Sequence, residues 1–83
     1  MHHHQLLQVV RQQVHTHLVG LGADADSGTE ETILIRDGIY CGRRFFLGEF
    51  MAIWFIEEEE LKFFDRSGAV AAVEQVQSVS RAA

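Results

Sequence analysis

Two neighbouring arginines, Arg43 and Arg44, are the residues best suited to bind an anion, because a guanidinium matches carboxylate and phosphate oxygens. Neighbours on a strand point to opposite faces, so both could grip one anion only across a bulge. The structural interpretation, which we favour, pairs Arg44 with Glu31 across a hairpin and lays Arg43 on Trp54 as a cation–π contact. The alternative is a small-molecule or anion-binding module in which the arginines, Tyr40 and Trp54 line the site.

The other reactive side chains lack the spacing that catalysis requires. The run Glu57–Glu60 could bind a cation or a basic partner, but carboxylates at a hairpin tip are typically solvated. Cys41 falls on an apolar strand, where a free cysteine behaves as a small hydrophobe. His15 and His17 diverge on an expected helix, whereas a metal pair needs positions i and i+4. An enzyme would need Cys41 or the glutamates in a cleft, so we expect a non-enzymatic protein without metal or cofactor.

The composition describes one small acidic domain over residues 1–83. Apolar residues make up 47% of the chain and charged residues 23%, as in globular proteins, and the net charge of −5 disfavours nucleic-acid binding. One cysteine and no apolar run of about 18 residues favour a cytoplasmic protein without a membrane partner. Met1 to His4 fits either a tag remnant or a native start, and these histidines carry no functional weight.

Periodicity and turn residues predict an α+β fold with the order α-β-β-β-β-α. Apolar residues at helical spacing favour a helix over Gln5–Val19, ended by Gly20 or Gly22. Four strands between Thr32 and Asp65 form the expected antiparallel meander. Valines at every third position predict a second helix over Ala69–Ser80.

Turn chemistry predicts how the strands pair. Asp37–Gly38 fits a two-residue hairpin turn, and Gly48–Glu49 fits a II′ turn with glycine first. A third turn has Glu58–Glu59 at its tip. The expected cross-strand pairs are Leu34–Cys41, Glu31–Arg44, Arg43–Trp54, Gly42–Phe55 and Trp54–Phe63.

Both faces of the expected sheet are apolar. The segment Phe50–Ile56 has no polar residue, and such a strand needs cover on both sides. An open face this apolar exceeds the patches that monomers usually expose. We therefore expect a homodimer that buries one sheet face and presents an edge or groove to an unidentified protein partner. The expected interface residues are Phe46, Met51, Ile53 and Phe55.

Overall fold

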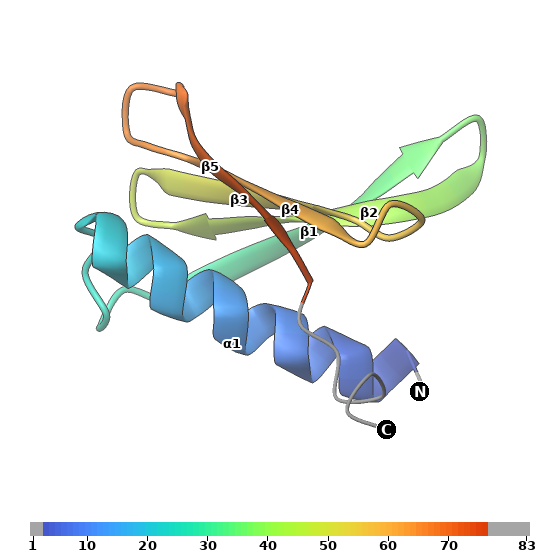
Figure 1. Ribbon diagram of the computed structural model, residues 1–83, viewed down its shortest axis with the longest axis horizontal. Coiled ribbons are helices and arrows are strands. Elements are labelled where there is room, and N and C mark those ends of the chain that lie inside the picture. Colours follow the sequence, from blue (N-terminus) through green and yellow to red (C-terminus); the bar gives the residue numbers. More distant parts are fainter. Residues whose placement is uncertain (1–2, 77–83) are drawn as a thin grey trace.

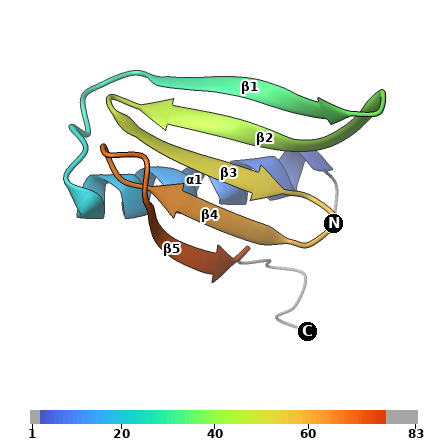
Figure 2. The ribbon, with the colours of Figure 1, turned by 90° about the horizontal axis from the view of Figure 1, so that it is seen from above.

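The computed structural model describes residues 3–76, with side chains from residue 5 onward, and shows one helix and a five-stranded antiparallel sheet. The strands lie in chain order across the sheet, as a meander (Figure 2). The helix covers one face of the sheet, so the fold has two layers (Figure 1). The elements are α1 (His3–Leu21), β1 (Thr29–Arg36), β2 (Ile39–Leu47), β3 (Phe50–Phe55), β4 (Glu60–Phe64) and β5 (Val70–Gln75).

The N-terminal helix expected from the apolar stripe is confirmed, although it is longer than the stripe alone predicts. Its stripe faces the sheet, and the buried members are Leu7, Val10, Val14 and Leu18. The helix ends at Leu21 and is followed by Gly22, whose φ of +119° suits glycine. The backbone N–H groups of Gly22 and Ala23 donate to the carbonyls of Val19 and Leu18, both at 3.0 Å. These two bonds satisfy carbonyls that the helix end would otherwise leave without a partner.

The β2–β3 hairpin has the expected register. Arg43 pairs with Trp54 and Gly42 with Phe55, on either side of a turn in which Gly48 has a φ of +62°. A Cβ atom on Gly42 would lie 2.1 Å from the backbone oxygen of Trp54. A side chain at this position therefore requires one of the two strands to move.

The β1–β2 hairpin differs from expectation by one residue. Asp37 and Gly38 form the expected turn, with φ values of +53° and +76°. Cys41 then adds an extra residue to β2, a bulge that the turn residues do not predict. The observed pairs are Leu34–Gly42, Ile33–Arg43 and Glu31–Phe45, so the expected pairs Leu34–Cys41 and Glu31–Arg44 are wrong. Because a one-residue shift exchanges the faces of a strand, Glu31 lies on the helix side.

The β3–β4 hairpin is shifted by two residues from expectation. Its turn spans Ile56 to Glu59, where the N–H of Glu59 donates to the carbonyl of Ile56 at 3.1 Å. Trp54 pairs with Leu61, so the expected Trp54–Phe63 pair is wrong. A two-residue shift preserves the faces, and Leu61 and Phe63 both remain on the side of Trp54.

The expected C-terminal helix is wrong in its described part, because Val70–Gln75 forms β5 against β4. Residues 77–80 of that expected helix lie outside the described residues. Asp65 turns the chain back: its Oδ1 accepts the N–H groups of Ser67 at 2.9 Å and Ala69 at 3.1 Å. Branched valine side chains favour a strand once a sheet edge is available to pair with.

The core lies between α1 and the sheet face that it covers. The largest wholly buried side chains include Trp54, Phe45 and Phe63 from three adjacent strands. Along β3, buried residues alternate strictly with partly exposed ones. This alternation shows that one face is dry and the other is not.

Candidate functional site

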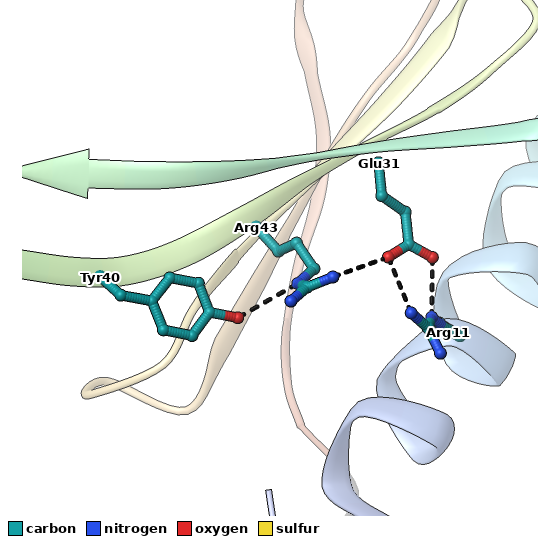
Figure 3. A network of polar contacts seen from close by, with 4 residues as sticks. All are labelled: Arg11, Glu31, Tyr40 and Arg43. Carbon is teal, nitrogen blue, oxygen red and sulfur yellow. Dashed lines mark hydrogen bonds and ion pairs between the residues drawn. The ribbon is translucent and has the colours of Figure 1, made fainter. Parts of the chain in front are cut away.

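A polar network joins α1 to the first hairpin on the helix side of the sheet (Figure 3). Arg11 donates twice to the carboxylate of Glu31, from Nε at 2.7 Å and from Nη2 at 3.1 Å. Arg43 donates from Nη1 to Oε1 of Glu31 at 3.1 Å and from Nε to the hydroxyl of Tyr40 at 3.1 Å. One carboxylate therefore holds two guanidinium groups, and the four residues together carry one excess positive charge.

The charges of this network depend on one another. Burial alone would raise the pKa of Glu31, but the hydrogen bonds from Arg11 and Arg43 outweigh it and lower the pKa below its ordinary value. The hydrogen bond to Tyr40, followed by the one to Glu31, raises the pKa of Arg43. Glu31 and Arg43 are thus both charged at neutral pH, and the ion pairs of Glu31 with Arg11 and Arg43 tie β1 and β2 to α1.

Glu31→Gln should reduce the free energy of unfolding by about 1 kcal/mol at neutral pH, because two arginines lose their counter-charge. The folded-state pKa of Glu31 is depressed, so its stabilisation is present above the ordinary pKa and lost as pH falls through the folded value. The difference between wild type and variant should therefore shrink in acid. Urea unfolding at neutral and acidic pH measures it.

Glu49→Gln is the matched control, because Glu49 is an exposed glutamate in the turn between β2 and β3, outside the network. It should leave stability nearly unchanged at both pH values. Equal losses in the two variants would show that general charge, rather than the network, stabilises the fold.

The arginines, Tyr40 and Trp54 that the sequence proposed as an anion site do not converge. Arg43 and Tyr40 are brought together, with the guanidinium carbon 5.7 Å from the ring centroid. Arg44 points to the opposite face of the sheet, as neighbours on a strand must. Trp54 is wholly buried beneath α1. Arg11 was missed, since the helix pattern places it among polar residues without indicating a partner.

The face opposite α1 is the second candidate, and we call it the open face. No helix among residues 3–76 lies on it (Figure 1). Its rows, read from β1 to β5, are the Met51 row (Glu30, Phe46, Met51, Phe64 and Val70), the Ile53 row (Thr32, Arg44, Ile53, Lys62 and Val73) and the Phe55 row (Leu34, Gly42, Phe55, Glu60 and Gln75). The four expected interface residues, Phe46, Met51, Ile53 and Phe55, all lie here and are partly exposed.

Charges interrupt the open face in an ordered way. Arg44 and Lys62 flank Ile53 within one row. The ammonium of Lys62 lies 5.5 Å from the ring centroid of Phe55, a cation–π distance. Glu60 pairs with Phe55 in the adjacent row. The centre of the open face is therefore apolar, with two cations and a carboxylate around it.

A hollow of about 320 Å³ lies near the β1–β2 turn, and Cys41, Glu57 and Glu58 are among its lining residues. The thiol of Cys41 lies 3.5 Å from the carbonyl oxygen of Leu34, to which it donates. A cysteine nucleophile needs a nearby base in an electropositive setting. The lining contains carboxylates, and neither His15 nor His17 contributes to it. The described lining residues therefore do not form the electropositive setting that a thiol nucleophile needs.

A larger hollow, of about 520 Å³, runs between α1 and β5 and is lined mostly by amide and hydroxyl side chains. His17 closes one part of it, stacked on Phe63 with ring centroids 4.0 Å apart and with Nδ1 3.0 Å from Glu74. Gln13 donates to Glu74 and to the carbonyl of Gln75. These contacts attach β5 to the helix, which is a structural role.

Two further properties concern the part of the chain that the structure describes. Within it, no group of three or more histidine, cysteine, aspartate or glutamate residues is arranged to hold a metal ion. Its helix is not apolar enough over a sufficient length to cross a membrane.

Comparison of the chain with protein-family models, curated proteins and solved structures finds no match.

Proposed function

We propose that this chain is a non-enzymatic interaction module that forms a homodimer by packing the open faces of two sheets. The observation that supports this proposal is the alternation along β3: one set of side chains is buried under α1, and the other set, Met51, Ile53 and Phe55, is apolar yet partly exposed. Phe46 of β2 and Phe64 of β4 extend this partly exposed apolar set. Packing two such faces together removes apolar surface from water, as in β-sandwich cores.

The size of the open face suits a second copy. Five strands spaced by about 4.8 Å span about 24 Å, and five residues along them span about 17 Å. The flat footprint is thus about 400 Å², and the accessible surface of its side chains is larger. Specific interfaces bury about 600 to 1,000 Å² on each partner. The flat footprint lies below this range, so the proposed interface is a small one and depends on the larger accessible surface of the side chains.

The charges on the open face favour one symmetry. A twofold axis along the strands would bring Arg44 against Lys62 of the partner subunit, which repels. An axis across the strands, midway between the Ile53 and Phe55 rows, instead brings Lys62 against the partner's Glu60 and Ile53 against the partner's Phe55. It also brings Arg44 against the partner's Gly42, where no side chain occupies the space. We infer this second axis because it pairs opposite charges twice.

The anion-binding module is the less supported alternative. Arg43 already donates to Glu31 and Tyr40, and Arg44 lies on the other face. An anion site would have to use Arg44 without the other three proposed residues. The arrangement of charges around an apolar centre supports the homodimer better.

Ile53→Glu should disrupt the proposed homodimer while leaving each subunit folded. Arg44 and Lys62 flank position 53 and can pair with a glutamate in the free subunit. In the dimer the same carboxylate would be buried against the partner's Phe55, which should raise the dissociation constant about a hundredfold or more. Size-exclusion chromatography with light scattering should show the assembled mass halved.

Val9→Glu is the control, since it makes the same charge change at a partly exposed β-branched residue on α1. It should keep the mass of the wild type. A wild-type mass of 9.4 kDa at micromolar concentration, or an unchanged mass for Ile53→Glu, would contradict the homodimer.

A further inference from the structure

The two outer strands of the sheet, β1 and β5, differ in how they are protected. An outer strand presents unpaired backbone N–H and C=O groups, which can pair with another chain. β5 has six residues, and Gln13 of α1 donates to the carbonyl of Gln75 at its end. β1 has eight residues and contains neither proline nor lysine, the residues that commonly block an edge.

The outer edge of β1 is also regular and apolar at its centre. The bulge residue Cys41 belongs to β2, so β1 itself keeps an unbroken alternation. Ile33 and Ile35 are 55% and 54% exposed, although isoleucine is normally buried. Charged residues stand only toward the ends of the strand, with Glu30 and Glu31 at one end and Arg36 at the other. This pattern is self-complementary in an antiparallel arrangement.

We propose that β1 pairs antiparallel with β1 of a second copy, about a twofold axis that passes through Ile33 perpendicular to the sheet. This edge pairing is separate from the open-face contact and does not depend on it. It would extend two five-stranded sheets into one continuous sheet across the subunits.

Symmetry restricts the register of such a pair. Residues directly opposite each other in an antiparallel pair point to the same face. A twofold axis perpendicular to the sheet leaves each side chain on its own face. An axis between two residues would place residues from opposite faces across from each other, so the axis must pass through a residue. The candidates near the strand centre are therefore Thr32, Ile33 and Leu34.

Charge selects Ile33 among these three positions. With the axis there, Glu30 lies opposite the partner's Arg36, and the same ion pair occurs twice. An axis at Thr32 places Glu30 opposite the partner's Leu34 and leaves Arg36 beyond the paired strand. An axis at Leu34 places Arg36 opposite the partner's Thr32. Only the Ile33 register gives both charged ends an opposite charge.

The edge axis and the proposed open-face axis are compatible. Ile33 lies in the cross-strand row of Arg43, Trp54, Leu61 and Glu74, which falls midway between the Ile53 and Phe55 rows. The two axes are perpendicular and lie at the same level along the strands. Such axes meet and generate a closed tetramer, one of the commoner symmetries of soluble oligomers. The tetramer rests on the proposed function, whereas the edge pair does not.

The test uses the full chain with substitutions at exposed residues, followed by size-exclusion chromatography with light scattering. Arg36→Glu places two carboxylates opposite each other at both ends of the edge pair, which should raise its dissociation constant about tenfold or more. Adding Glu30→Arg to the same chain reverses both charges and should restore the pair. Ile53→Glu serves as the background in which the open-face contact is absent.

The wild type should have a mass of about 38 kDa, four times that of the chain. Ile53→Glu and Arg36→Glu should each give about 19 kDa, and the two together 9.4 kDa. The edge pair is overturned if Arg36→Glu keeps the wild-type mass, or if Glu30→Arg does not restore what Arg36→Glu removes. An unchanged mass for Ile53→Glu overturns the open-face dimer alone, so the two failures are distinguishable.

Discussion

Gly42→Ala should destabilise the protein by about 3 kcal/mol, a large part of the stability of a domain of this size. The added Cβ would lie 2.1 Å from the backbone oxygen of Trp54, so β2 and β3 must separate. These strands form the centre of the sheet, and their separation weakens both the hydrogen-bond ladder and the core beneath it. Urea unfolding followed by the fluorescence of Trp54 measures the loss.

Gly20→Ala is the matched control, because a Cβ at Gly20 meets nothing within 4 Å. Gly20 lies within α1, where alanine is favoured over glycine by up to about 1 kcal/mol. The control should therefore be neutral or stabilising. If Gly42→Ala behaves in the same way, the close approach of the two strands is not a constraint on this residue.

The central hairpin was predictable because its signals are local and agree. Glycine at the first position of the Gly48–Glu49 turn specifies the turn type, which in turn specifies the pairing of Arg43 with Trp54 and Gly42 with Phe55. The two apolar faces were also evident from the run Phe50–Ile56. The predicted pairing of β2 with β3 was thus correct, because turn chemistry and hydrophobic pattern lead to the same register there.

The first hairpin shows the limit of that reasoning. Its turn was correct, but one unpaired residue, Cys41, moved Glu31 from the expected side of the sheet to the helix side. The expected partner Arg44 was thereby replaced by Arg43 and Arg11. A bulge has no sequence signature in this segment, so the partners of the partly buried carboxylate of Glu31 could not be derived from the strand pattern.

The C-terminal segment was mistaken for a helix because its valines recur at every third position, which is a helical spacing. Helical spacing places Val70 and Val73 on one stripe. In the sheet they also share a face, since a register shift at the end of β4 adds a residue between them. The hydrogen bonds that Asp65 accepts from Ser67 and Ala69 decide the outcome, because they turn the chain back on itself. The segment then lies beside β4 and pairs with it as β5. Tertiary pairing then overrides a weak helical pattern.

Trp54→Ala should reduce the free energy of unfolding by about 3 to 5 kcal/mol, because it empties the centre of the core. Trp54 of β3 is wholly buried beneath α1 and is the largest wholly buried side chain among the described residues. It is also the single tryptophan of the chain, so circular dichroism replaces fluorescence for this variant. Ile39→Ala, at a residue that is 67% exposed, should cost less than about 1 kcal/mol.

The Trp54→Ala variant also distinguishes a core role for Trp54 from a role in a ligand site or subunit interface. A tryptophan that lined an anion site or a subunit interface would reduce ligand binding or assembled mass when truncated, with a smaller effect on the unfolding of the subunit. A core tryptophan does the reverse: at temperatures where the variant remains folded, its assembly should match the wild type. If Trp54→Ala keeps the free energy of unfolding of the wild type but loses the assembled mass, Trp54 contacts a partner rather than the core. The open face would then no longer account for self-association.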